Sequence, residues 1–183
     1  MLIADLPHFY IEEDGLHAMI ISKRAKTAEQ AIEYLDDFLP HVIDVQTCDA
    51  LRMPALAKRP DLALPRLREW SKSLEPYTAR FAIMTLLRDF SGDAFTPVQL
   101  DWVAAIGEHL SGRNWFTEHH SYRVRSAVKR YFTYQLVHHY ADTSSYFDEP
   151  RFERQLHNEI LQSAASSKIV SPGRKSELNA MKI

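Results

Sequence analysis

The sequence predicts an all-α protein, and three observations support this class. Hydrophobic residues make up 45% of the 183 residues and charged residues 25%, a composition that argues against disorder. Only 5 glycines are present, and no segment combines sustained polar and apolar alternation with a turn dipeptide such as Asn-Gly. Apolar residues instead recur at helical spacing along most of the chain. We therefore expect helices and no β-sheet.

The first third of the chain predicts three helices. The first is expected over residues 9–22, where apolar side chains fall at helical spacing. Thr27 and Gln30 have the spacing of a capping box, which predicts the start of a second helix that ends at Pro40. Asp44 is a good N-cap residue and predicts the start of a third helix.

Residues 65–90 are the most distinctive segment. They read as two helices joined by a tight corner, the first with Trp70 on its apolar side and the second opening at Pro76, where the missing N–H costs nothing. The second helix is apolar on most faces, which is typical of a buried helix. Arg80 is the exception in this helix. An arginine in such a place must reach solvent or find an anion.

Four helices are expected in the second half of the chain. The first opens at a second capping box, formed by Thr96 and Gln99 with Pro97 between them, and reaches Leu110. The second and longest covers residues 120–140. The third starts at Pro150, and the fourth is short and starts at Ser171 and Pro172. Helix openings near residues 44, 76 and 119 recur at the spacing of helical-repeat proteins, roughly 33 to 47 residues. This spacing predicts an α-α superhelix, whose concave face could hold an elongated polymer.

The length of 183 residues suits a single domain over residues 1–183. The only cysteine, Cys48, excludes an intramolecular disulfide and fits a reducing cytoplasm. The first residues lack the basic and apolar segments of a signal peptide, and no segment approaches the length of about 18 apolar residues that a membrane span needs. We therefore expect a cytoplasmic protein with no membrane partner.

The charges are distributed unevenly along the chain. The net charge is −2, but residues 1–50 hold 10 Asp and Glu against 3 Lys and Arg. A basic cluster follows later, with Glu118 as the one acidic residue between its ends: Arg113, Arg123, Arg125, Lys129 and Arg130. Such a cluster is the minimal electrostatic footprint of a phosphate-binding surface. The alternative is an ordinary solvated helix face.

Several segments resemble the AlkD-like DNA alkylation repair family. They are FLPHVIDVQTCDAL (38–51), LREWSKSLEPYTARFAIMTLLRDF (67–90), FTPVQLDWVAAI (95–106), SYRVRSAVKRY (121–131) and the C-terminal ASSKIVSPGRKSELNAMK. The resemblance implies a HEAT-like superhelix that binds double-stranded DNA and excises alkylated purines as a DNA glycosylase. It also implies that neither a metal nor another cofactor is needed. It implies as well that the leading helices of full-length members have no counterpart here.

The resemblance assigns two residues individually. Asp49 matches the family's catalytic carboxylate, and Arg80 matches an arginine of the DNA-binding cleft. A purine alkylated at N7 or N3 is already cationic and leaves readily, so positive charge develops on the deoxyribose in the transition state. A fixed carboxylate stabilises that charge. In the family the lesion is attacked without being flipped into a deep pocket, unlike the usual glycosylase route.

The chain departs from the family at the aromatic platform beside the carboxylate. Val45 and Arg130 stand where the family has tryptophans, and Thr133 stands where it has a further arginine. Each lost cation–π contact costs about 0.5 to 2 kcal/mol. Three aromatic residues are candidates to compensate: Tyr77, Trp115 and Tyr131.

Each candidate also has a structural interpretation. Asp49 could be a surface carboxylate or the ion-pair partner of Arg52 or Arg80, and Cys48 is best interpreted as a small buried hydrophobe. The adjacent histidine pairs lack the i, i+4 spacing of zinc ligands. Two further functions therefore stay open beside the glycosylase, namely a non-catalytic DNA-binding module and a protein-interaction scaffold.

Overall fold

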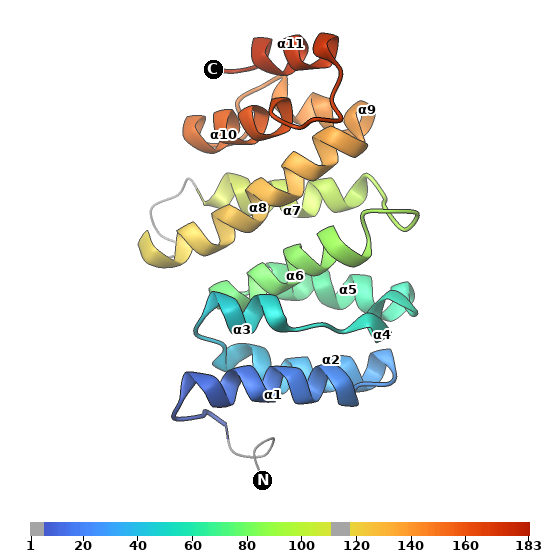
Figure 1. The fold of residues 1–183 in the computed structure, drawn as a ribbon, viewed down its shortest axis with the longest axis vertical. Helices are drawn as coiled ribbons and strands as arrows, with labels where there is room; N and C mark the ends of the chain where they lie inside the picture. Colours follow the sequence, from blue (N-terminus) through green and yellow to red (C-terminus); the bar gives the residue numbers. More distant parts are fainter. Residues whose placement is uncertain (1–5, 111–117) are drawn as a thin grey trace. The chain divides into compact units, whose positions relative to one another are not determined.

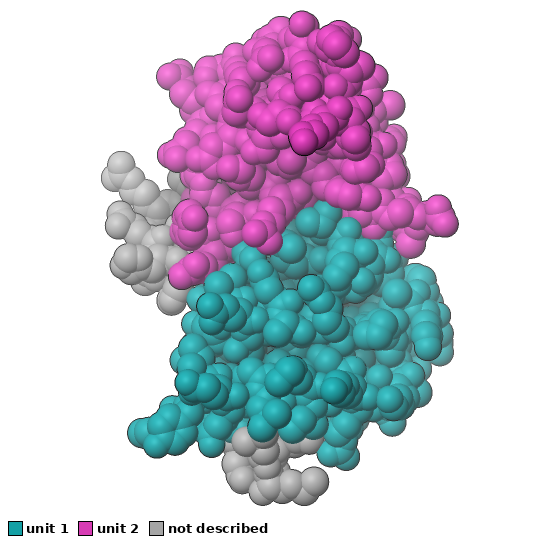
Figure 2. Space-filling model, viewed as in Figure 1, with its two compact units in different colours: residues 1–90 teal, residues 91–183 magenta. Residues whose placement is uncertain are grey.

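The computed structural model describes residues 6–110 and 118–183. In these residues the secondary structure is helical and contains no strand, which confirms the predicted all-α class. The chain divides into two compact units, residues 1–90 (unit 1) and residues 91–183 (unit 2), coloured separately in Figure 2. The expectation of a single domain over residues 1–183 stays a prediction.

The sequence predicts the caps of two helices in unit 1. Its described elements, drawn in Figure 1, are α1 (Ile11–Arg24), α2 (Ala28–Phe38), the 3-10 turn η2 (Leu39–His41), α3 (Val45–Ala50), α4 (Pro54–Ala57), α5 (Pro60–Ser71) and α6 (Pro76–Asp89). Thr27 Oγ1 accepts a hydrogen bond from the Gln30 amide at 3.3 Å, which confirms the predicted cap of α2. Asp44 Oδ1 caps α3 by accepting from the amides of Gln46 and Thr47, at 2.8 and 2.9 Å.

The helices of unit 1 pack in two rows. In one row α1 contacts α3 and α3 contacts α6, and in the other α2 contacts α4 and α5. Figure 1 shows α1, α3 and α6 in front of α2 and α5. The rows meet where α5 packs along α6, with Leu67, Phe81 and Leu86 fully buried. Burying each such side chain contributes about 1.5 to 3 kcal/mol, so this contact fixes where the side chains of α6 point.

The helix before the corner begins earlier than the segment that the sequence analysis singled out. That segment starts at residue 65, but α5 begins at Pro60, and Pro65 lies inside it. Pro60 offers the preset φ and the missing N–H that suit a first helical turn. The chain starts the helix there and accepts one absent backbone hydrogen bond at Pro65.

Unit 2 is built around the longest helix. Its described elements are α7 (Val98–His109), α8 (Glu118–His138), α9 (Tyr140–Thr143), the 3-10 turn η3 (Ser144–Phe147), α10 (Arg154–Ala165) and α11 (Pro172–Ala180). α8 contacts α7, α9 and α10, and α10 contacts α11. The ring of Phe132, on α8, lies 5.8 Å from that of Phe147 and 5.1 Å from that of Phe152. This aromatic cluster forms the centre of the core of unit 2.

Two predicted helix starts in unit 2 are corrected by side-chain packing. Gln99 does not form the capping box with Thr96, because its buried amide donates to the Ala94 carbonyl at 3.1 Å instead. The helix expected from Pro150 begins only at Arg154, because Phe152 turns into the aromatic cluster before the helix starts. Tertiary contacts overrode the local signal in both places.

Within residues 6–110 and 118–183, no helix combines the length and the apolar character that crossing a membrane requires.

Candidate functional site

Asp49 and Arg80 lie together in unit 1. Asp49 is on the short helix α3, and Arg80 is in the middle of α6, which α3 contacts. Arg80 Nε donates to Asp49 Oδ1 at 2.9 Å, and Nη2 donates to Oδ2 at 2.8 Å. Two parallel charge-assisted hydrogen bonds of this kind fix both the position and the plane of a carboxylate. Of the two structural partners considered for Asp49, the structure selects Arg80.

The two side chains differ in exposure. The Arg80 side chain is 3% exposed, whereas that of Asp49 is 36% exposed. Arg80 therefore meets the expectation that an arginine in an apolar helix finds an anion, and the anion is Asp49. The carboxylate is the solvent-facing member of the pair. Any ligand that approaches this place from solvent meets Asp49 before it meets Arg80.

Cys48, the residue before Asp49, is buried as expected. Its Sγ lies 3.4 Å from the Tyr77 carbonyl oxygen, to which it donates. Burial and the negative charge of Asp49 raise the pKa of the Cys48 thiol to about 12. Because the thiolate is the nucleophilic form, Cys48 is unreactive at neutral pH.

The candidate aromatic substitutes are placed differently. Tyr131 is fully buried in unit 2, and desolvation raises the pKa of its hydroxyl. It therefore offers no ring face to a ligand. Tyr77 and Val45 are half-buried in unit 1. Trp115 lies outside the described residues.

The predicted basic cluster is partly neutralised. Arg125 forms an ion pair with Glu153, and its Nη2 lies 3.8 Å from Glu159 Oε1. Lys129 Nζ lies 3.3 Å from Glu159 Oε2. Both glutamates belong to the α10 region, 28 residues after Arg125 and 30 residues after Lys129 respectively. The part of this cluster nearest α10 therefore has its own acidic partners.

One further member of the cluster, Arg130, is exposed to solvent. No ion-pair partner for it is present among the described residues. The Arg123 guanidinium carbon lies 5.8 Å from the centre of the Tyr122 ring, which is itself exposed. Arg113 lies outside the described residues.

The two units differ in net charge. Unit 1 carries 14 Asp and Glu and 11 Lys and Arg in the sequence, which gives a net charge of −3. Unit 2 carries 10 Asp and Glu and 11 Lys and Arg, which gives +1.

A polar cluster in unit 1 was missed by the sequence analysis. Asp14 and His17 lie on the buried face of α1, and His17 Nδ1 lies 2.8 Å from His8 Nε2. The His17 ring stacks on Phe38 with 4.3 Å between ring centres. Asp14 and His17 share the apolar stripe of α1 with Ile21, three and four residues apart. Polar residues on the apolar stripe of a helix are the sequence signal that could have identified this buried cluster.

His17 predicts an acid-dependent loss of stability. Burial, followed by the nearby His8, lowers the pKa of His17 below its ordinary 6.5. The unfolded chain therefore takes up a proton more readily than the folded chain. The free energy of unfolding should decline as the pH falls through 6.5, by at most about 1.4 kcal/mol per pH unit for one proton. Chemical unfolding at pH values from about 8 to 5.5 measures this decline.

A matched variant separates His17 from other titrating groups. Burial raises the pKa of Asp14, so the folded chain takes up a proton at this carboxylate more readily than the unfolded chain, and its effect on stability has the opposite sign. Asp44 and His41 also act on Asp14, so the wild type and His17→Gln should be compared at each pH. His17→Gln should flatten the pH dependence. An equal pH dependence in the wild type and His17→Gln would contradict the assignment.

In the part of the chain that the structure describes, no three His, Cys, Asp or Glu side chains are grouped so that they could hold a metal ion. No family model, no curated protein and no solved structure matches this chain. The candidate functional site therefore stands on its residues alone: a fixed, partly exposed Asp49 in unit 1 and a partly neutralised basic helix, α8, in unit 2.

Proposed function

We propose that the chain is a diverged DNA alkylation repair protein of the AlkD-like type, which binds duplex DNA and uses Asp49 to hydrolyse the N-glycosidic bond of an alkylated purine. One observation carries this proposal: a buried arginine fixes a carboxylate that stays open to solvent. The two-row packing of unit 1 is compatible with the α-α superhelix that belongs to the same proposal.

In this mechanism Asp49 acts through its charge. An ionised carboxylate has about four lone-pair sites, and Arg80 uses two of them. The remaining sites can face the deoxyribose, on which positive charge develops as the cationic purine leaves. The guanidinium offsets part of the carboxylate charge, but it also removes the need to reorganise the side chain during the reaction. Arg80 is in this scheme a positioning residue.

Base release from alkylated DNA tests the proposal. Purified protein is incubated with methylated duplex DNA, and free methylated purine is quantified by mass spectrometry. Asp49→Asn should abolish release, and Asp37→Asn, at an exposed position on α2, should leave it unchanged. Asp49→Asn also places an uncharged amide beside buried Arg80, so the melting temperature of the variant must be measured.

A second variant keeps the test decisive. Asp49→Asn with Arg80→Gln replaces the ion pair by two amides that can bond to each other, so the fold should survive without a buried charge. Loss of base release in this folded double variant supports the proposal. Release by the folded double variant at the wild-type rate, or no release by the wild type from any methylated DNA, refutes it.

A non-catalytic DNA-binding module is the second candidate. It is favoured by the residues Val45 and Arg130 at the positions of the family's aromatic platform. It predicts binding to duplex DNA that weakens steeply with salt and no release of base. A protein-interaction scaffold, favoured by the net charge of −3 in unit 1, predicts no binding to DNA even at low salt.

A further inference from the structure

A groove of about 610 Å³ runs along α10 in unit 2. The walls come from α10 itself, from Lys129 on α8 and from Lys182 close to the C-terminal end. Three basic side chains line it, Lys129, Arg154 and Lys182, together with two glutamates and several amide and hydroxyl groups. Arg154 and Lys182 lie outside the basic cluster that the sequence analysis identified, because they are far from it in the sequence.

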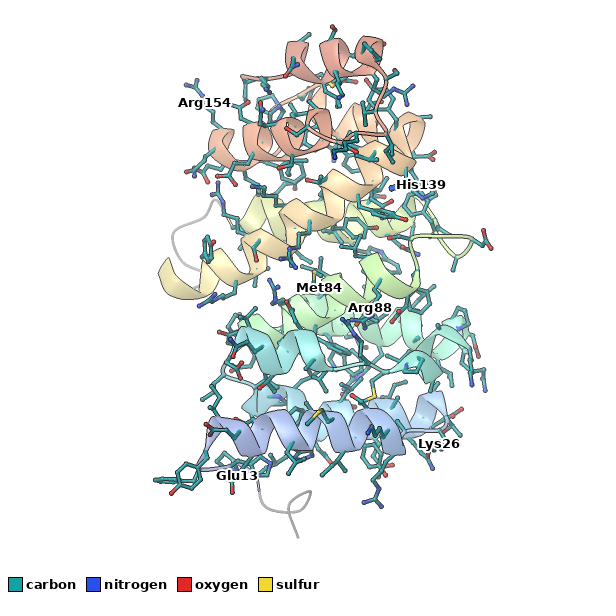
Figure 3. All side chains as sticks on the ribbon, in the orientation of Figure 1. Glu13, Lys26, Met84, Arg88, His139 and Arg154 are labelled. Carbon is teal, nitrogen blue, oxygen red and sulfur yellow. The ribbon has the colours of Figure 1, made fainter. Side chains whose placement is uncertain are left out.

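Two of these cations have no carboxylate partner among the described residues. Lys182 Nζ donates to two neutral oxygens, Gln162 Oε1 and, at 2.7 Å, Asn179 Oδ1. Arg154 is exposed, and Figure 3 shows its side chain extending outward from the start of α10. Both cations can therefore take an anion without giving up an ion pair.

The two glutamates of the groove are already engaged by α8. Glu153 pairs with Arg125, and Glu159 lies between Arg125 and Lys129. Although burial opposes ionisation of Glu159, hydrogen bonds from Gln155 and Lys129 and the charges of Lys129 and Arg125 lower its pKa. Arg125, which does not line the groove, offsets the charge of these carboxylates. The groove is left with a positive balance carried by Arg154 and Lys182.

The C-terminal wall is held in place by hydrogen bonds to α10. The Asn158 side chain donates to the Ile183 carbonyl at 2.6 Å and accepts from the Ile183 amide at 3.0 Å. His157 Nε2 lies 2.9 Å from the Met181 carbonyl oxygen. Lys182 stands between these two anchored residues. Its ammonium group is therefore positioned over the groove by the fold, and does not sit on a free chain end.

We propose that this groove is a phosphate-binding site, in which Arg154 and Lys182 hold the phosphate oxygens and Lys129 and the amides of α10 complete the site. Arginine and lysine donate charge-assisted hydrogen bonds to phosphate. The phosphates can come from a nucleic-acid backbone or from a free polyphosphate. The proposal does not depend on Asp49 or on base excision, because every residue in it belongs to unit 2.

Binding to two phosphate probes tests the site. A fluorescein-labelled 12-base-pair DNA duplex and inorganic tripolyphosphate are titrated against the full chain, by anisotropy and by calorimetry respectively. Arg154→Gln with Lys182→Gln should weaken the binding of the probe that the groove takes by about tenfold or more. If that probe is the duplex, the slope of log affinity against log salt should fall by about two, the number of phosphate contacts removed.

The matched control removes the same charge elsewhere in unit 2. Lys168→Gln with Lys175→Gln takes away two positive charges that do not line the groove, and should change binding by less than twofold. Tighter wild-type binding of tripolyphosphate than of duplex identifies a free polyphosphate as the ligand, and the reverse identifies nucleic acid. Equal losses in the two double variants, or no wild-type binding of either probe, would overturn the proposal. Melting temperatures verify that both variants fold.

Discussion

Replacing Asp49 by leucine is expected to lower the free energy of unfolding by about 3 to 5 kcal/mol, since it removes the carboxylate partner of a buried arginine. Arg80 is buried, so water cannot easily replace the carboxylate that accepts hydrogen bonds from its Nε and Nη2. Urea unfolding followed by circular dichroism, with linear extrapolation, measures the loss.

A surface pair of the same geometry is the control. Arg59 Nε and Nη2 donate to Asp61 Oδ1 and Oδ2 at 2.9 and 2.7 Å, but the two side chains are 50% and 61% exposed. Asp61→Leu should cost far less than Asp49→Leu, because water solvates both groups when the pair is broken. Equal losses for Asp49→Leu and Asp61→Leu would show that burial of Arg80 has no energetic consequence, and would contradict the prediction.

The double variant asks why the pair is present at all. Asp49→Leu with Arg80→Met replaces both charges by apolar side chains, and such replacements are often neutral or stabilising. We expect the double variant to unfold within about 1 kcal/mol of the wild type. The ion pair between Asp49 and Arg80 would then add little to stability. What it would still do is hold a partly exposed carboxylate in a fixed position. This is the arrangement that the proposed reaction requires.

The sequence was sufficient where a feature depends on neighbours along the chain. Thr27 and Asp44 cap their helices as predicted, and Pro76 opens α6, because capping depends on residues two to four positions apart. The need of Arg80 for an anion also followed from its own helix. The sequence left the pairing open between Arg52 and Arg80 for Asp49, because Asp49 is 31 residues from Arg80 and sits on a separate helix.

The charge of α8 shows the opposite case. Counting charges between Arg113 and Arg130 predicted a basic surface, but the partners of Arg125 and Lys129 arrive from the α10 region 28 and 30 residues later. Counting charges within one segment does not include an acidic residue that the fold places beside that segment from another helix. Lys182 was missed for the same reason. Hydrogen bonds between the C-terminal segment and α10 hold it over the groove.

Gly107→Ala in α7 is expected to destabilise the protein by about 1 to 3 kcal/mol, although alanine is the better helix former. An added Cβ would lie 2.7 and 2.8 Å from two ring atoms of Phe152 and 3.3 Å from Val128 Cγ1. The Phe152 ring cannot move aside, because it is buried against Phe132 and Phe147. Unfolding in urea gives the loss.

Gly15→Ala in α1 is the matched control, because an added Cβ there has no atom of another described element within 4 Å. Without a clash, the helix propensity of alanine should stabilise the protein by about 0.5 to 1 kcal/mol. Phe152→Leu should recover part of the loss in the Gly107→Ala background by vacating the space that the methyl group needs. A stabilising effect of Gly107→Ala would mean that α7 and the aromatic cluster are not in contact as described. Opposite signs at the two glycines would show that the approach of α7 to Phe152 outweighs local propensity in shaping unit 2.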